Sequence, residues 1–460
     1  MSVRAVHQTM NISKLVSLGF ALVPASASWA QPCSPTWEAN TPGFNGAVQT
    51  LISADLGAGP RLYAGGAFTV DGSKVAVWTG SGWEGVGTGL PNSAVQSLLV
   101  FDDGQGPALY ATAFTGVFRL QGVTWQRLPD LSGPNLTLST VDPDGPGPEP
   151  VRLCVAGSFS FPFPRTEVGC AYWDGVAWQS VGSGIPATSA LSCEVVSAAN
   201  LDPDGDGPEP SALYVVGAFN STQFCSIVKW DGSTWSREAA HLTGSSRYAG
   251  ALAVFDDGTG PALYVSGNFI NGNQLIRYRG GTWTAVGNPQ YLVSGLGRDG
   301  VRGMAVVNDG SGPMLLFGAR LWSSASGHML AWRRGGLAPY SLGVGVFPSI
   351  SSPVNALVTV RDAAGTYLAV GGWISGVLDA VGQYSPVSYF ARLSLCPDIC
   401  NSDFDHDGDA ATDADIEAFF ACLAGDCCVT CISADFNGDG DIGNDADIES
   451  FFRVLAGGNC

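Results

Sequence analysis

The chain is organised around a segment of about 50 residues that recurs along most of its length. In its clearest copy, between Val195 and Trp235, short runs of β-branched and aromatic residues alternate with Asp, Gly and Pro. Such runs, bounded by turn residues, predict about four antiparallel strands. A sheet with two apolar faces cannot stand alone, so it requires copies of itself on both sides.

The repeat is clearest at its second strand and at its last hairpin. The second strand recurs as Arg61–Phe68, Ala108–Phe114, Arg152–Phe159, Ala212–Phe219, Ala262–Phe269, Met314–Leu321 and Tyr367–Ile374. The last hairpin recurs as Trp78–Trp83, Leu120–Trp125, Trp173–Trp178, Trp230–Trp235, Tyr278–Trp283 and Trp332–Leu337. Four-stranded units of this period are typical of a β-propeller, and their number predicts about seven blades, over residues 31–395.

The aromatic pairs of the last hairpins are expected to serve packing between blades rather than ligand stacking. With Asp-Gly as a two-residue turn, as in Trp173–Trp178, both aromatic side chains are expected on one face, diagonally across the hairpin.

The first and last copies are incomplete in complementary ways. Thr36–Glu38 matches a fourth strand without the three before it. The last copy, Pro353–Ser394, stops after its third strand, Ser388–Leu393. We therefore expect the N-terminal strand to complete the last blade, which would close the ring and remove exposed sheet edges.

The charge pattern argues against nucleic acid as a partner. The formal net charge is -19, and the 21 Lys and Arg residues are scattered, whereas a phosphate backbone requires a basic stripe. Only 13% of the residues are charged and 62 are Gly, which is the profile of a turn-dense all-β protein with large buried sheets.

Residues 1–30 read as a secretory signal peptide. Arg4 and Lys14 supply its positive start and Leu15–Val23 its apolar core, and Ala30 ends a small-x-small cleavage site. No later stretch is long and apolar enough to span a bilayer. We therefore expect an exported protein that is secreted or associated with the outer surface of a bacterial cell.

In an exported protein the 12 cysteines predict disulfides. Three pairs are expected within the propeller: Cys33–Cys396 at the closure, Cys154–Cys170 across neighbouring strands, and Cys193–Cys225 between two loops of one blade. The other six are expected to pair within the tail, in one of fifteen ways: Cys400, Cys422, Cys427, Cys428, Cys431 and Cys460.

One turn between the first two strands of a repeat has a second interpretation besides hairpin chemistry, for which Asp and Gly are suited. Asp202, Asp204 and Asp206 have alternate spacing and end in Gly207, which can converge carboxylates on one Ca²⁺. This hairpin resembles the calcium loops of FG-GAP (integrin-type) propellers. The last carboxylate of that pattern is displaced, since Glu209 lies one residue early.

Composition changes abruptly at Cys396, where a tandem repeat of about 30 residues begins. Each copy has oxygen ligands at alternate positions followed by Gly, as in the front half of an EF-hand loop. Thr412 with Asp415, and Asn444 with Asp447, have the spacing of a capping box and predict a helix after each loop. The expected apolar stripes are Ile416, Phe419, Phe420 and Leu423 in the first helix, and Ile448, Phe451, Phe452 and Leu455 in the second.

Two such units resemble a dockerin, the calcium-folded module that docks secreted proteins onto a cohesin, in the Gly- and Cys-rich variant common in planctomycete-type secreted proteins. The resemblance covers residues 396–460 and implies a cohesin-like or envelope sorting protein as partner. The implied calcium ligands are Asp403, Asp405, Asp407, Asp409, Asp415, Asp435, Asn437, Asp439, Asp441 and Asp447, with Asp409 and Asp441 acting through backbone carbonyls. Each loop has one inserted residue, so Asp413 and Asp445 compete with Asp415 and Asp447 as the closing ligand; we favour the latter two.

The sequence contains no catalytic constellation. The mature His residues, His241, His328 and His406, are not arranged with Cys or Asp as a base or zinc site. We therefore favour a non-catalytic propeller for binding or display, which would bind a glycan or a protein and be attached through the calcium-dependent tail. The alternative is a polysaccharide-active enzyme, a glycoside hydrolase or lyase, in a dockerin-assembled complex, because propellers also host such enzymes at their axis.

Overall fold

The computed structural model describes residues 35–456 with gaps. The gaps are residues 39, 58, 130, 146, 161–167, 186–192, 205–208, 220–224, 239–248, 258, 268, 270–274, 287–302, 309–312, 319–328, 334–335, 340–344, 349–353, 363–364, 379–383, 396–401, 406–410, 426–433, 435, 437–442 and 444. The first unit of the chain, Met1–Pro32, lies outside the described residues, and with it the expected signal peptide.

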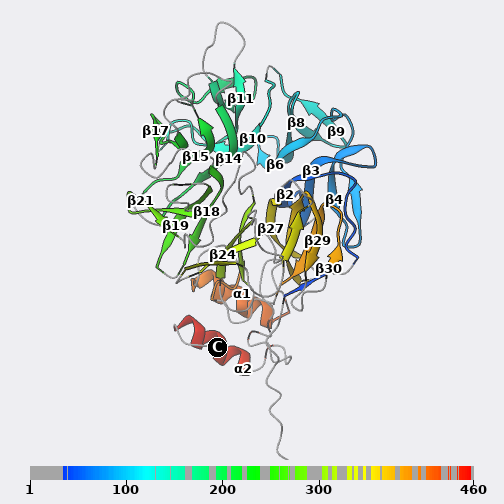
Figure 1. Ribbon diagram of the computed structural model, residues 1–460. Coiled ribbons are helices and arrows are strands. Elements are labelled where there is room, and N and C mark those ends of the chain that lie inside the picture. The colour runs from blue at the N-terminus through cyan, green and yellow to red at the C-terminus, as the bar shows by residue number, and fades with distance from the viewer. Residues whose placement is uncertain are drawn as a thin grey trace, which may run out of the picture. The chain divides into compact units, whose positions relative to one another are not determined.

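The propeller has seven four-stranded antiparallel blades, which confirms the predicted fold class (Figure 1). From inner to outer strand, the first three blades are β2 (Val48–Asp55), β3 (Pro60–Val70), β4 (Ser73–Trp78) and β5 (Trp83–Gly85); β6 (Val95–Asp102), β7 (Pro107–Ala113), β8 (Gly116–Gln121) and β9 (Thr124–Arg127); and β10 (Thr137–Val141), β11 (Arg152–Ser160), β12 (Val168–Trp173) and β13 (Trp178–Ser180). The next three are β14 (Cys193–Leu201), β15 (Ala212–Phe219), β16 (Cys225–Trp230) and β17 (Trp235–Arg237); β18 (Ala249–Asp256), β19 (Pro261–Gly267), β20 (Leu275–Arg279) and β21 (Thr282–Val286); and β22 (Met304–Asn308), β23 (Pro313–Gly318), β24 (Met329–Arg333) and β25 (Gly336–Pro339).

The seventh blade joins the two ends of the propeller. Its strands are β27 (Val354–Asp362), β28 (Gly365–Gly372), β31 (Phe390–Ser394) and, from the N-terminus, β1 (Thr36–Trp37). In β1, Thr36 pairs with Ser394 and Trp37 with Leu393, antiparallel. The inner strand of each blade contacts that of the next, and β27 contacts β2. The predicted closure by the N-terminal strand is therefore confirmed.

The middle strands are buried on both faces because each blade is covered by its two neighbours. In β7, Ala108–Ala113 are all buried, and in β15 so are Leu213–Val216. This double coverage explains why these strands read as continuous apolar runs instead of alternating ones.

The aromatic pairs pack between blades, as expected, but their hairpin geometry differs from the prediction. Trp173 lies directly opposite Trp178, and Trp230 directly opposite Trp235. The predicted diagonal placement is wrong because the connecting loop has four residues and not two. Asp231 begins one such loop by accepting hydrogen bonds from the N–H groups of Thr234 and Ser233, which lower its pKa to about 2.

The outer-strand tryptophans also link consecutive blades through hydrogen bonds. Trp125 Nε1 donates to Val86 O at 2.8 Å, Trp235 Nε1 to Val181 O at 2.9 Å, Trp83 Nε1 to Pro42 O at 3.0 Å, and Trp283 Nε1 to Glu238 Oε2 at 2.9 Å. In each case the acceptor follows the outer strand of the preceding blade. The repeated tryptophan is thus a repeated contact between neighbouring blades.

We expect Trp125→Phe to lower the free energy of unfolding by about 1–2 kcal/mol, because it removes one buried hydrogen bond and leaves a small void. Urea unfolding followed by the fluorescence of the other tryptophans measures the change. Trp373→Phe is the matched control, since Trp373 is 40% exposed. Equal stability of the two variants would contradict the proposed interblade role of Trp125.

An additional small sheet was not predicted. It consists of β26 (Gly345–Pro348), β29 (Ile374–Leu378) and β30 (Tyr384–Pro386). Strands β29 and β30 form a hairpin inserted between the second and third strands of the seventh blade. The repeat pattern predicts a second strand that extends to Ile374, whereas the strand ends at Gly372 and Ile374 begins β29.

The tail contains two helices, α1 (Asp413–Leu423) and α2 (Asp445–Leu455). The predicted capping box of α1 is confirmed, because Thr412 and Asp415 bond each other's backbone N–H groups. The core of the tail comprises Phe404, Phe419, Cys422, Ala434, Phe436 and Phe451. The predicted stripes are only partly core, since Phe420 and Phe452 are each 45% exposed.

The cysteine predictions are tested only in part. Cys422 is buried and disulfide-bonded. The predicted Cys154–Cys170 bond is corrected, because the structure has two buried thiols with their sulfur atoms 3.4 Å apart. The register explains this, since Cys154 lies opposite Tyr172 and Cys170 opposite Ala156, so the two are diagonal neighbours.

The predicted Cys193–Cys225 pair lies on strands whose backbone is described but whose cysteine side chains are not. Both residues are register partners of Phe219, on opposite sides of β15. In a regular sheet two strand spacings, about 9–10 Å, exceed the Cα separation of a disulfide. A bridge would therefore need the ladder to depart from regularity, as it does in the register shift between Val216 and Phe219. The remaining predicted disulfide residues lie outside the described part: Cys33, Cys396, Cys400, Cys427, Cys428, Cys431 and Cys460.

Within the described ranges, no helix is long and apolar enough to cross a membrane.

Candidate functional site

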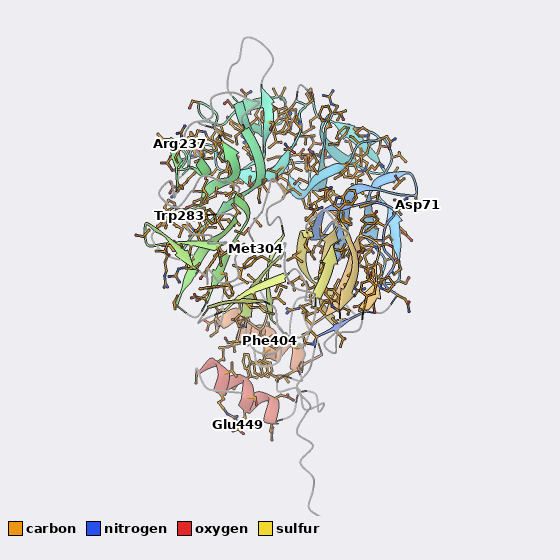
Figure 2. The ribbon with its side chains drawn as sticks, in the orientation of Figure 1. Asp71, Arg237, Trp283, Met304, Phe404 and Glu449 are labelled. Carbon is orange, nitrogen blue, oxygen red and sulfur yellow. The ribbon has the colours of Figure 1, made fainter. Side chains whose placement is uncertain are left out.

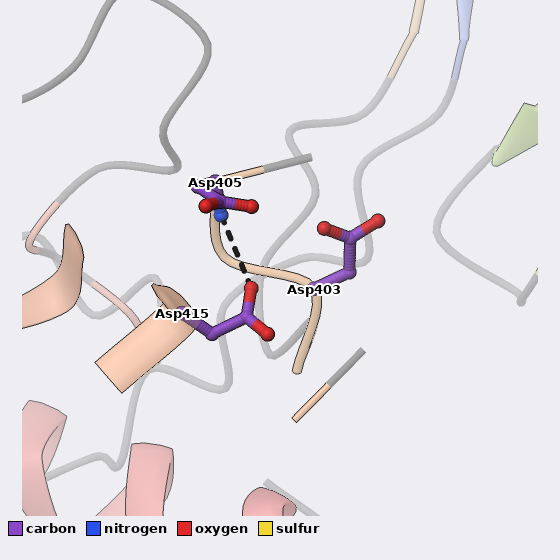
Figure 3. A group of neighbouring side chains, drawn as sticks. All are labelled: Asp403, Asp405 and Asp415. Carbon is purple, nitrogen blue, oxygen red and sulfur yellow. Dashed lines mark hydrogen bonds between the residues drawn. The ribbon is translucent and has the colours of Figure 1, made fainter. Parts of the chain in front are cut away.

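The tail brings three carboxylates together at the start of α1. One carboxylate oxygen from each of Asp403, Asp405 and Asp415 lies within 4.8 Å of the others (Figure 3). Asp403 and Asp405 come from the acidic loop, and Asp415 is the third residue of the helix. The sequence predicted that these residues share a site, and the structure also distinguishes between the two possible closing residues: Asp415 joins the cluster, whereas Asp413 is exposed.

Asp415 is fully buried, and its carboxylate is held by the backbone. Its Oδ1 accepts hydrogen bonds from Phe404 N at 2.5 Å and Asp405 N at 3.3 Å, the latter drawn in Figure 3. Its Oδ2 accepts from Thr412 N at 2.8 Å and Thr412 Oγ1 at 3.0 Å. One side chain thus caps the helix, fixes the loop and contributes to the cluster.

The three carboxylates fit a hard cation that prefers oxygen ligands. At pH 7 three negative charges repel one another at this separation, and a divalent ion would offset that repulsion. No basic side chain among the described tail residues does so, because Arg453 pairs with Glu449. Figure 2 labels Glu449, which lies on α2, and Phe404, which lies between Asp403 and Asp405 in the acidic loop.

The other predicted ligands are tested less completely. Asp407, Asp409, Asp435, Asn437, Asp439 and Asp441 lie outside the described residues. Asp447, the counterpart of Asp415, is fully buried in α2. Phe404 and Phe436, which follow the first acid of each loop, are both fully buried. The two copies therefore share a buried Phe after the first acid of the loop and a buried Asp in the first turn of the helix.

The blade-four loop supports the hairpin interpretation at the two acids that the structure describes. Asp202 Oδ1 accepts from Asp204 N at 3.2 Å, and Asp204 Oδ2 accepts from Glu209 N at 3.3 Å. In the blade-three loop, Asp142 Oδ1 accepts from Asp144 N at 3.4 Å, and Asp144 Oδ2 accepts from Glu149 N at 3.3 Å. This loop has the same two bonds although its sequence has Pro where blade four has Asp206. These two hydrogen bonds therefore do not require the third carboxylate, that of Asp206, which lies outside the described residues.

A cavity of about 500 Å³ at the propeller axis was not predicted. It is lined by the inner strands of all seven blades and the residues just before them. Its polar side chains are Gln49, Thr50, Gln96, Ser97, Asn135, Thr137, Ser197 and Asn355. None of the described lining residues is acidic, basic or aromatic. In the sequence, the only indication of this cavity is that several repeats have polar residues in their first strand or just before it.

No family model matches the chain, and no curated protein matches it. Two solved structures of the extracellular domain of BT4673 from B. thetaiotaomicron, one described as a one component system and the other as a hybrid two component system, each match with a TM-score of 0.50 and 10% identity. Each match covers 82% of this chain and 42% of that chain, so this chain spans less than half of the protein it matches. A structure of BBS1N in complex with ARL6DN matches with a TM-score of 0.45 and 12% identity, over 80% of this chain and 97% of that one. At 10% identity the likeness to the BT4673 domain is one of fold.

Proposed function

We propose that this chain is an exported, non-catalytic propeller for binding or display, attached to the cell exterior or to a complex through a calcium-stabilised docking tail. The observation that carries the proposal is the meeting of Asp403, Asp405 and Asp415 at the start of α1. The signal-like N-terminus supports export. The propeller fold is also found in the extracellular domain of another protein.

Calcium would act here as a structural ion. Asp403, Asp405 and Asp415 would hold it, and it would neutralise the loop, while Asp415 and Thr412 cap the helix. Because a loop with unscreened carboxylates resists closing, ion binding and folding of the tail should be coupled.

The two helices offer a repeated exposed surface for a partner. Phe420 and Phe452 occupy equivalent positions, and their ring centroids are 6.1 Å apart. Each Phe is preceded by an exposed Glu three residues earlier and an exposed Asp seven residues earlier. These are Glu417 and Asp413 in α1, and Glu449 and Asp445 in α2. The matching partner, a cohesin-like or envelope sorting protein, would have an apolar pocket with a basic rim.

The axial cavity favours binding over hydrolysis. A glycosidase requires two carboxyl groups beside the scissile bond, and a general acid-base site requires a titratable group within hydrogen-bond reach. The described cavity lining offers only amides, hydroxyls and apolar side chains. This composition supports the non-catalytic proposal over the polysaccharide-active alternative, which a reducing-sugar assay on candidate polysaccharides tests directly.

The test is a calorimetric titration of calcium into the chelator-treated full chain with its disulfides intact. We expect two equivalents, and one fewer after Asp403→Asn/Asp405→Asn. Asp202→Asn/Asp204→Asn is the matched control and should leave the stoichiometry unchanged, because those acids bond their own hairpin. Absence of binding at millimolar calcium would remove the physical basis of the docking tail.

A further inference from the structure

Three of the four amide side chains that line the axial cavity, those of Gln49, Gln96 and Asn355, are each used at one end only. Asn355 Nδ2 donates to Val48 O at 2.8 Å and to Gln49 Oε1 at 3.3 Å, which joins the seventh blade to the first. Gln96 Oε1 accepts from Leu136 N at 3.1 Å, which joins the second blade to the third. These bonds fix the orientation of all three amides.

The opposite ends of the same amides are available to a ligand. Within the described part of the chain, Gln49 Nε2, Gln96 Nε2 and Asn355 Oδ1 have no hydrogen-bond partner. The same holds for the hydroxyls of Thr50 and Thr137, which also line the cavity. The axis therefore presents donors and acceptors whose positions are set in advance by contacts between blades, which lowers the ordering cost of binding.

The polar side chains of the lining are unevenly distributed around the ring. Blades seven, one and two carry three of the four amides, whereas the described lining residues of blades five and six are Ala251, Leu252, Gly303 and Met304. Met304, at the start of β22, is labelled in Figure 2. A ligand in this cavity would meet hydrogen-bonding groups on one side and apolar surface on the other.

We propose that the axial cavity binds a neutral sugar ring, which would make the propeller of the proposed function a glycan-binding module. A pyranose has hydroxyls at its edge, each a donor and an acceptor, and apolar C–H groups on its face. Amides that offer both functions match the edge, and Leu252 with Met304 matches the face. A charged ligand is disfavoured because no described lining residue offers a counter-charge. A volume of about 500 Å³ suits a mono- or disaccharide unit, either free or at the end of a polymer.

The test measures binding of neutral sugars to the full chain by saturation-transfer NMR and calorimetry. The probes are glucose, galactose, mannose, N-acetylglucosamine and their β-linked disaccharides, with glucuronate and glucosamine as charged comparators. Gln49→Glu and Gln96→Glu keep the oxygen that accepts the interblade hydrogen bond but replace the available N–H donor with an acceptor. Gln105→Glu, the same change on an exposed loop, is the matched control.

The expected result is binding of at least one neutral sugar, weakened at least tenfold by Gln49→Glu or Gln96→Glu and unchanged by Gln105→Glu, with thermal stability preserved. The double variant should gain affinity for glucosamine. A neutral polysaccharide that binds more tightly than its free disaccharide would identify a chain end as the natural source of the ring, whereas equal affinity would identify the free sugar.

Two results would overturn the cavity assignment: no neutral sugar bound at tens of millimolar, or sugar binding that the two Glu variants leave unchanged. Neither outcome affects the calcium titration, which tests the tail separately. Consumption of a disaccharide by the unaltered chain, sensitive to the same two variants, would instead retain the cavity as a sugar site and refute the non-catalytic function.

Discussion

Replacing Asp415 with alanine is expected to unfold the tail around α1 while the propeller stays folded. The substitution removes a buried carboxylate that accepts hydrogen bonds from three backbone N–H groups, those of Phe404, Asp405 and Thr412. Hydrogen bonds to a charged group contribute more than neutral ones, and buried donors left without partners add to the loss. We expect the local stability to fall by about 3–5 kcal/mol, with loss of one calcium site.

The composition of the chain allows the two parts to be followed separately. Residues 396–460 contain no Trp or Tyr, so intrinsic fluorescence reports on the propeller alone. Hydrogen exchange in peptides spanning α1 reports on the tail, where protection should fall at least a hundredfold in Asp415→Ala. Asp413→Ala is the control, because Asp413 is exposed in the same helical turn and should cost only a few tenths of a kcal/mol. Equal effects of the two substitutions would show that Asp415 does not hold the loop.

Most of the fold was predictable because the repeat supplies the same information several times. The run Ala212–Phe219 was predicted with the bounds that β15 has in the structure, since it is apolar throughout and ends in turn residues on both sides. The closure by Thr36–Trp37 followed from two incomplete copies. The β29–β30 hairpin was not predictable, because it occurs in one blade only and interrupts the repeat.

The sites were predictable where the chemistry is local in the sequence. Asp403, Asp405 and Asp415 lie within one loop and one helical turn, and their spacing identified them. The axial cavity is built from two to four residues of each of seven blades. Gln49 and Asn355, about 300 positions apart, therefore meet only through ring closure. No local pattern contains that information.

We expect Arg392→Ala to destabilise the propeller more than any other substitution of a charged residue in its described part, because Arg392 lies where the ring closes. Arg392 is only 5% exposed, and its Cζ lies 3.7 Å from the ring centroid of Tyr367 and 5.0 Å from that of Trp78, in the first blade. Its Nε is 3.2 Å from Glu38 Oε2 without hydrogen-bond alignment, so this contact is electrostatic. Loss of the cation–π contacts, the ion pair and the packed side-chain stem should cost about 3–4 kcal/mol.

Urea unfolding followed by tryptophan fluorescence tests this prediction against an arginine at the surface of the propeller. Arg61, on β3, is exposed, so Arg61→Ala should change stability by less than about 0.5 kcal/mol. Glu38→Ala should cost less than Arg392→Ala, since Glu38 is 31% exposed on its side chain and the cation–π contacts survive. A double-mutant cycle with Glu38→Ala and Arg392→Ala measures the coupling energy between the two side chains. The backbone bond from Glu38 N to Arg392 O, at 2.9 Å, is present in all four proteins of the cycle, so it does not contribute to that energy. If Arg392→Ala proved as stable as Arg61→Ala, backbone pairing of β1 with β31 would be sufficient to close the ring.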